Sequence, residues 1–156
     1  MGRICIFTGK GHGKSPAAIG EALMAAANGK QVVIIQYLKG KGLDNHEILN
    51  RLEPELKIFH FEKSDEQYEE LSDKRKEEEI FNIKNGINFA KKVLSTGECD
   101  LLVLDEILGI VDNGILSVSE LEELLKLRPD GMDIIMTGIN ADEAVIKLAD
   151  NISVIS

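Results

Sequence analysis

The sequence predicts an α/β fold in which helices cover both faces of a mostly parallel β-sheet. Short runs rich in β-branched residues alternate with longer segments of helical periodicity. Nearly all of these runs are continuously apolar, which is typical of strands buried on both faces of a parallel sheet. The 156 residues are 44% hydrophobic, enough for one core, so we expect a single three-layer, doubly wound domain over residues 1–156.

Six apolar runs are predicted to be the strands of this sheet. Right-handed crossovers are expected between parallel neighbours, because a right-twisted strand followed by a helix packs back onto the sheet in that way. The predicted strands are Arg3–Phe7, Gln31–Tyr37, Lys57–Phe61, Leu101–Leu104, Asp133–Met136 and Ile152–Ile155.

Apolar periodicity and capping residues predict the two longer helices. Ser15–Asn28 is rich in alanine and is followed by Gly29, which suits a left-handed helix end. Asp73–Leu94 carries apolar residues at alternating steps of three and four, so one stripe faces the sheet. Its acidic start is interpreted as a solvated face with favourable charge near the helix N-terminus.

Two shorter helices are expected between the fourth and fifth strands. The first follows Glu106 and ends near Asn113–Gly114. The second begins at Ser117 or Ser119, and Ser119 with an acid three positions later resembles a capping box. The segment Arg128–Gly131 then predicts a turn.

The charge and cysteine content excludes several classes of protein. With 27 acidic and 18 basic residues the net charge is -9, which argues against nucleic acid or a membrane as a partner. The positive charge is segregated, because residues 1–42 carry +5 and the remainder -14. Cys5 and Cys99 have neither metal-ligand nor disulfide-framework spacing, and no signal or membrane-spanning run is present. We therefore expect a cytoplasmic protein.

The strongest motif lies between the first predicted strand and the first helix. A glycine-rich loop there can turn its backbone N–H groups inward, at the positive end of the helix dipole, and so bind phosphates. Lys14 adds a positive charge and Ser15 a hydroxyl that suits Mg²⁺. We expect ATP to be bound by Thr8, Gly9, Lys10, Gly11, His12, Gly13, Lys14 and Ser15.

The loop is a variant of the general pattern G-x-x-x-x-G-K-[ST], which has glycine where Thr8 stands. Two other interpretations of the loop fit less well. A dinucleotide-binding loop would need different glycine spacing, and an acid rather than Gln36 at the end of the second strand. A glycine-rich turn without a ligand remains the alternative, although Lys-Ser at a strand-to-helix junction is uncommon in such turns.

A second motif is the apolar strand that ends in Asp105 and Glu106. Ligands of open parallel sheets lie beyond the carboxyl ends of the strands, so both acids should lie at the same edge as Lys14. Carboxylate oxygens suit Mg²⁺, which usually keeps part of its hydration. We expect Ser15, Asp105 and Glu106 to be the metal site.

Together these motifs resemble the P-loop ATP:corrinoid adenosyltransferases, which have a P-loop NTPase (RecA-like) fold. The phosphate loop and the acidic strand are similar to those of that family. The discriminating element is Gln36-Tyr37-Leu38-Lys39-Gly40, which generic P-loop ATPases do not share. Three further pairs fall where the family has similar ones, namely Arg128-Pro129, Thr137-Gly138 and Ala149-Asp150.

The resemblance implies an enzyme that transfers the 5'-deoxyadenosyl group of ATP to the Co(I) of a reduced corrinoid and releases triphosphate. It implies Mg²⁺ or Mn²⁺ as cofactor, an electron-donating flavoprotein as a partner, and a homodimer. Lys14 and Glu106 would be catalytic, with Gln36 and Lys39 joining the loop in binding ATP. No general base is needed, and His46 and His60 are interpreted as incidental.

The sequence departs from the family at several positions. His12 stands where lysine is usual, Pro16 where serine or threonine is usual, and Ile139 where arginine is usual. A Gly-Phe-Thr-Trp-like segment after the third strand is missing, and the chain has no tryptophan. These differences predict weaker phosphate binding, and a corrinoid half that is altered or lost beside a retained nucleotide half.

Two alternative functions follow from the same motifs. One is an ATP-binding regulatory or interaction protein of this fold that lacks transferase activity, which the departures favour. The other is a P-loop ATPase or kinase, in which Glu106 would polarise water or a substrate hydroxyl. The phosphate product separates the three functions, because transfer gives triphosphate, hydrolysis or kinase action gives ADP, and a binding protein gives neither.

Overall fold

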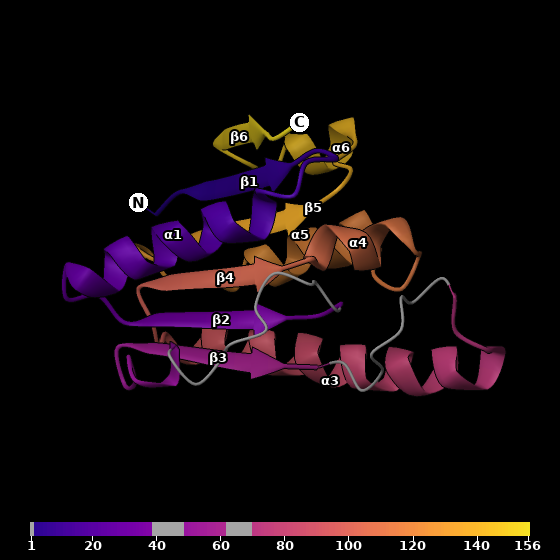
Figure 1. The fold of residues 1–156 in the computed structure, drawn as a ribbon, viewed down its shortest axis with the longest axis horizontal. Helices are drawn as coiled ribbons and strands as arrows, with labels where there is room; N and C mark the ends of the chain where they lie inside the picture. Colours follow the sequence, from indigo (N-terminus) through magenta and orange to yellow (C-terminus); the bar gives the residue numbers. More distant parts are fainter. Residues whose placement is uncertain (1, 39–48, 62–69) are drawn as a thin grey trace.

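The structure, a computed structural model, describes residues 2–38, 49–61 and 70–156 of the chain. Six strands in these residues form one sheet with the order β3-β2-β4-β5-β1-β6, and every pair is parallel. The predicted α/β fold with a parallel sheet is thereby confirmed (Figure 1). The strands are β1 Ile4–Thr8, β2 Val32–Gln36, β3 Leu56–His60, β4 Leu101–Asp105, β5 Asp133–Gly138 and β6 Asn151–Val154.

Helices cover both faces of the sheet, which gives the three predicted layers. One helix, α1, crosses one face, and α3, α4 and α5 lie on the other (Figure 1). The helices are α1 Lys14–Ala27, α3 Asp73–Thr96, α4 Ile107–Asp112, α5 Val118–Leu125 and α6 Glu143–Ile146.

Alternate residues of the central strands build two separate core clusters. On β2, Val33 and Ile35 pack with α3, α4 and α5, whereas Val32 and Ile34 pack under α1. Because successive strand side chains point to opposite faces, a strand covered on both sides must be apolar at every position. This is the physical reason why continuous apolar runs predicted the strands correctly.

The helix ends agree with the capping predictions, and of the two starts expected for α5 the structure has Ser117. Gly29 after α1 has φ +84°, as expected of a left-handed helix end. The N-cap of α5 is Ser117, whose hydroxyl accepts from the N–H of Glu120 while the Glu120 carboxylate accepts from the N–H of Ser117. The capping box expected at Ser119 is therefore wrong by two residues. Ser117 also has an acid three residues later, Glu120, so both serines match the capping-box pattern and the structure has the earlier one.

The short helix α6 was not predicted from the sequence. In α6, Asp142 accepts a hydrogen bond from the N–H of Val145, so a side-chain cap is present. The helix has only four residues, which is too short for an apolar period to be recognised. Among the described residues, no helix combines the length and the apolar character needed to cross a lipid bilayer.

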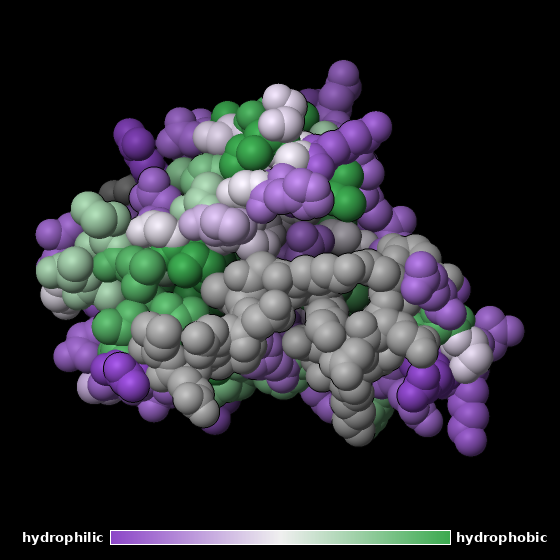
Figure 2. Space-filling view, in the orientation of Figure 1, coloured by the Kyte–Doolittle hydropathy of each residue, from purple (hydrophilic) through white to green (hydrophobic). Residues whose placement is uncertain are grey.

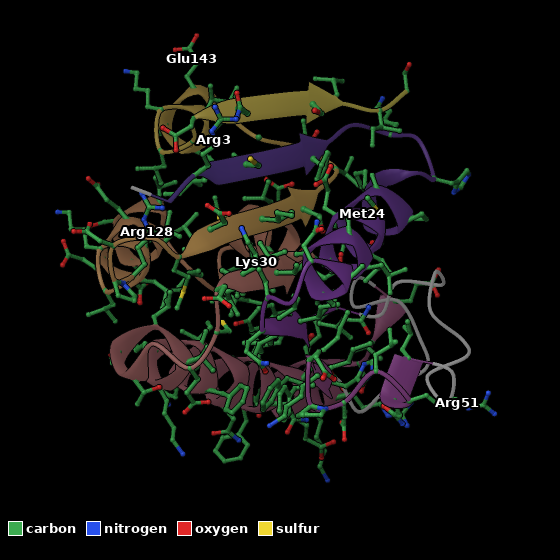
Figure 3. The ribbon with its side chains drawn as sticks, turned by 90° about the vertical axis from the view of Figure 1, so that its left-hand side faces the viewer. Arg3, Met24, Lys30, Arg51, Arg128 and Glu143 are labelled. Atoms are coloured by element: carbon green, nitrogen blue, oxygen red, sulfur yellow. The ribbon has the colours of Figure 1, made fainter. Side chains whose placement is uncertain are left out.

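The two sheet edges differ in character. A cavity of about 490 Å³ lies at the amino-terminal edge, and Arg3, Met24 and Lys30 line it (Figure 3). Apolar side chains gather on the face of the sheet that α1 covers (Figure 2), and Met24 of this helix is 65% exposed.

The carboxyl-terminal edge of the sheet lies at the arrowheads in Figure 1. At this edge β1 runs into the glycine-rich loop before α1.

The close approach of α4 to β5 gives a test of the packing. A Cβ atom on Gly138 would overlap Cβ of Leu108 and lie 3.2 Å from its Cα, so Gly138→Ala must push α4 away from the sheet. Overpacking of this kind typically costs about 1–3 kcal/mol, and we expect a loss of that size in the free energy of unfolding, measured in urea.

Gly20→Ala is the matched control. Gly20 lies inside α1 with open space around its Cα, so the same substitution should stabilise the protein by about 0.5–1 kcal/mol through helix propensity. Equal effects of the two substitutions would contradict the packing described for α4 and β5.

Candidate functional site

The glycine-rich loop is anchored by the backbone of Ile139, which follows β5. The hydroxyl of Thr8 and the N–H of Gly9 both donate to the carbonyl oxygen of Ile139, at 2.9 and 3.0 Å. Gly9 has φ +115°, a conformation that other residues rarely adopt. The Thr8 side chain therefore fixes the start of the loop, and its hydroxyl proton is committed to this contact.

The end of the chain packs directly against the same loop. Ile155 donates its N–H to the carbonyl of Thr8 at 2.7 Å, and its carbonyl accepts from the N–H of Gly11 at 2.9 Å. A Cβ on Gly9 would overlap the Ile155 carbonyl oxygen, and a Cβ on Gly11 would lie 2.8 Å from it. Two glycines of the motif are thus required by packing as well as by loop flexibility.

These contacts locate the N–H groups that a phosphate could meet. Those of Gly9 and Gly11 already donate to protein carbonyls. The first N–H groups of a helix have no partner within the helix, and α1 begins at Lys14 with Gly13 as its N-cap. The N–H groups of Lys14 and Ser15 therefore form the donor set at the positive end of the α1 dipole.

Lys14 is held over this helix start. Its Nζ donates to the carbonyl oxygen of Gly11 at 3.1 Å, and the residue is only 8% exposed. An ammonium group has three donors, so this contact leaves others for an incoming anion. The loop therefore presents a positive charge beside free N–H donors.

Asp105 is the centre of a hydrogen-bonded cluster at the end of β4. Its carboxylate is 1% exposed. Oδ1 accepts from the Ser15 hydroxyl at 2.9 Å and from the Thr137 hydroxyl at 2.8 Å, and Oδ2 accepts from Nε2 of Gln36 at 3.2 Å. A buried carboxylate is tolerated only when several donors compensate its lost hydration. The cluster joins the loop to the ends of β2, β4 and β5.

Glu106 leaves the strand in a different direction. It is the residue before α4, and its φ of +64° is left-handed. Its N–H donates to the Thr137 hydroxyl at 2.7 Å. A Cβ on Gly109 would lie 3.3 Å from Glu106 Oε2, so the carboxylate lies over the first turn of α4. The two acids of the motif therefore have distinct surroundings, Asp105 buried and Glu106 half-buried.

The structure brings some of the predicted site residues together and separates others. Lys14, Ser15, Gln36 and Asp105 meet at the carboxyl edge of the sheet. Lys10 and His12 lie on the loop with exposed side chains, and His60 is exposed at the end of β3. Lys39 and His46 lie outside the described residues, as does Gly40 of the discriminating motif.

The remaining described part of that motif has a structural role. Tyr37 is fully buried and donates its hydroxyl to the carbonyl of Gly86 on α3 at 3.1 Å. Burial raises the pKa of this phenol well above its usual range, so Tyr37 stays protonated. Leu38 lies against the first turns of α4, since a Cβ on Gly109 would come 2.8 Å from its Cδ1. The motif thus connects β2 to both α3 and α4.

Two residues of the site were missed by the sequence analysis. Thr137 is fully buried, and its hydroxyl contacts the carboxylate of Asp105 and the backbone N–H of Glu106. The sequence indicated it only through the family resemblance of Thr137-Gly138. Its position at the carboxyl end of a parallel strand was a usable indication. Ile155 had no such indication, because its role depends on its backbone.

Two other resembling pairs have structural roles away from the loop. Arg128 donates to the carbonyls of Gly2 and Met132 at 2.7 and 3.1 Å. Asp150 accepts from the N–H of Ile4 at 2.8 Å and so fixes the start of β1 beside β6. Gly2 and Met132 precede β1 and β5, so Arg128, labelled in Figure 3, lies at the amino-terminal edge of the sheet.

The donor set suits a magnesium ion that arrives with a nucleotide. In the described ranges no group of three or more His, Cys, Asp or Glu side chains could hold a metal ion. Mg²⁺ is commonly bound by one or two protein oxygens together with substrate phosphates and water. Ser15 donates its proton to Asp105, which leaves the lone pairs of its oxygen free for such an ion.

The chain is similar to known proteins over nearly its whole length. The family model "ATP:corrinoid adenosyltransferase BtuR/CobO/CobP" matches residues 1–156. A corrinoid adenosyltransferase of Escherichia coli K12 is 30% identical over 152 residues, which covers 97% of this chain and 75% of the relative. The corrinoid adenosyltransferase CobA of Salmonella typhimurium LT2 gives the same identity and coverage.

A solved structure supports the fold independently. A KaiC-like protein of Pyrococcus horikoshii OT3 superimposes with a TM-score of 0.64 over 97% of this chain and 69% of its own, at 17% identity. That likeness is one of fold alone. The family match over residues 1–156, with curated relatives that cover nearly the whole chain, shows more: the chain belongs to the ATP:corrinoid adenosyltransferase family.

Proposed function

We propose that this chain transfers the 5'-deoxyadenosyl group of ATP to the Co(I) of a corrinoid and releases triphosphate. Within a chain of this family, one observation carries the proposal. Lys14, Ser15 and Asp105 converge at the start of α1, where a triphosphate would meet a positive charge, N–H donors and a magnesium site. ATP and the corrinoid are the substrates, and Mg²⁺ or Mn²⁺ accompanies the nucleotide.

In the transfer, the electron pair of Co(I) forms the cobalt–carbon bond while the bond between C5' and the triphosphate oxygen breaks. The electron pair of that broken bond leaves with the triphosphate. The protein must therefore stabilise negative charge on the leaving group and hold C5' in line with the cobalt. No proton has to be moved by a side chain, so the site needs no general base.

The residues at the start of α1 divide these tasks. Lys14 exchanges its contact with the Gly11 carbonyl for a phosphate oxygen. The N–H groups of Lys14 and Ser15 donate to the same phosphates, at no cost in reorganisation because the helix already orients them. Ser15 and Asp105 would hold Mg²⁺, which would supply positive charge to the leaving triphosphate.

Several finer points belong to the same proposal. Residues 1–156 act as one P-loop nucleotide-binding domain, which the single sheet supports. The enzyme works as a homodimer in the cytoplasm, and a flavoprotein supplies the electron that generates Co(I). The free thiols of Cys5 and Cys99 are compatible with a reducing compartment.

An anaerobic assay tests the function directly. With chemically reduced cobalamin, Mg²⁺ and ATP, we expect the Co(I) absorbance to fall as adenosylated corrinoid and triphosphate appear in equal amounts. Formation of ADP would instead indicate an ATPase or kinase. Intact Mg-ATP binding with no turnover on several corrinoids would indicate a nucleotide-binding regulatory protein.

Substitution of the loop lysine tests the phosphate site. Lys14→Ala removes a charge-assisted contact, which is typically worth about 2 kcal/mol, so Mg-ATP should bind about thirtyfold more weakly in calorimetry. Lys30→Ala is the matched control, because Lys30 lies at the amino-terminal edge of the sheet (Figure 3) and should leave the dissociation constant unchanged. Unchanged binding in Lys14→Ala would rule out this loop as the triphosphate site.

Replacement of Pro16 is expected to strengthen Mg-ATP binding, whereas replacement of Lys14 weakens it. As the third residue of α1, it lacks the N–H that another residue would present to a phosphate in the first turn. Pro16→Thr restores the N–H and adds a hydroxyl, and we expect Mg-ATP to bind about threefold to tenfold more tightly. Pro16→Ala restores the N–H alone and separates the two contributions. If neither variant tightens binding, Pro16 does not limit the affinity of the loop.

A further inference from the structure

The hydroxyl of Thr137 makes one hydrogen bond to each of Asp105 and Glu106, and the donor of each bond can be assigned. It lies 2.8 Å from Oδ1 of Asp105 and 2.7 Å from the backbone nitrogen of Glu106. A backbone N–H can only donate and an ionised carboxylate can only accept. The hydroxyl proton therefore points to Asp105, and an oxygen lone pair receives the N–H of Glu106. Since the residue is completely buried, no water replaces either bond.

The first of these bonds controls where the Asp105 carboxylate points. Oδ1 receives the hydroxyl protons of Thr137 and Ser15, and Oδ2 receives the amide of Gln36. Gln36 is the direct neighbour of Asp105 across β2 and β4, whereas Thr137 is on β5 at the other side. The carboxylate is thus held from both adjacent strands. Its remaining hydrogen bond fixes the Ser15 hydroxyl on the phosphate loop.

The second bond stabilises the turn at Glu106. A left-handed φ is unfavourable for a residue other than glycine, and Glu106 has φ +64°. This conformation makes the chain leave β4 so that Asp105 stays in the cluster while Glu106 passes over α4. The bond from the Glu106 N–H to Thr137 offsets that cost and satisfies an N–H that lies before the helix begins.

We propose that Thr137 is a positioning residue for the magnesium–ATP site: its hydroxyl holds Asp105 toward Ser15 and Glu106 in its left-handed turn. The proposal rests on the proposed nucleotide site and goes beyond it, because Thr137 itself touches neither ATP nor metal. Its effect should be confined to metal-assisted binding. The contacts of Lys14 and the helix N–H groups with phosphate do not pass through Asp105.

The test compares ATP binding with Mg²⁺ and with EDTA, by calorimetry, in three proteins. Thr137→Val keeps the shape of the side chain and loses both hydrogen bonds, whereas Thr137→Ser keeps the hydroxyl and loses only the methyl group. In Thr137→Val we expect the gain in affinity that Mg²⁺ provides to fall about tenfold, with binding in EDTA unchanged. Thr137→Ser should restore most of the gain.

Two results would overturn the proposal. One is an unchanged magnesium gain in Thr137→Val, and the other is an equal loss in Thr137→Ser, which would assign the effect to the methyl group. If Thr137→Val does not fold, as judged by circular dichroism, Thr137→Ala removes the same bonds with less crowding and takes its place. Because nucleotide binding is the readout, the test remains decisive even if no corrinoid is adenosylated.

Discussion

The buried carboxylate of Asp105 is the constraint on which the rest of the site depends. An ionised group that is 1% exposed is stable only if hydrogen-bond donors replace its hydration, and here α1, β2 and β5 each supply one. Those donors can meet only if the ends of the three strands β2, β4 and β5 are level, as the register makes them. The order of the central strands therefore fixes the distance between the phosphate loop and the acidic strand.

The glycine-rich loop obeys a second constraint, from the packing of the chain's last residues. Ile155 occupies the space that side chains at Gly9 and Gly11 would need, and its backbone bonds both flanks of the loop. Ile139 contributes its carbonyl from the other side. Although Ile139 stands where the family usually has arginine, its backbone thus keeps a role in the site. The loop is held by these main-chain contacts and by the Thr8 hydroxyl, so the exposed side chains of Lys10 and His12 take no part in holding it.

These two constraints preserve the frame of the proposed nucleotide site in a divergent member of the family. The contacts that shape it run through backbone atoms and through six polar side chains, namely Thr8, Lys14, Ser15, Gln36, Asp105 and Thr137. His12 stands where the family usually has lysine, and because its side chain is exposed it takes no part in these contacts. Pro16 is tolerated near the start of α1, where the missing N–H breaks no bond within the helix. Both departures therefore bear on affinity rather than on architecture.

The sequence by itself determined the parallel sheet, its six strands and the placement of the Lys14 loop and the acidic strand at one edge, because apolar runs and strand-to-helix loops are local patterns. It left Ser117 and Ser119 as two possible starts of α5, because both match the capping-box pattern, and it did not determine the strand order or the short α6. Gln36 and Thr137 are 101 positions apart in the sequence, and only the tertiary structure showed that both donate to the carboxylate of Asp105. Hydrogen bonds across neighbouring strands leave no periodicity in a sequence, and this is why Thr137 and Ile155 were identified only in the fold.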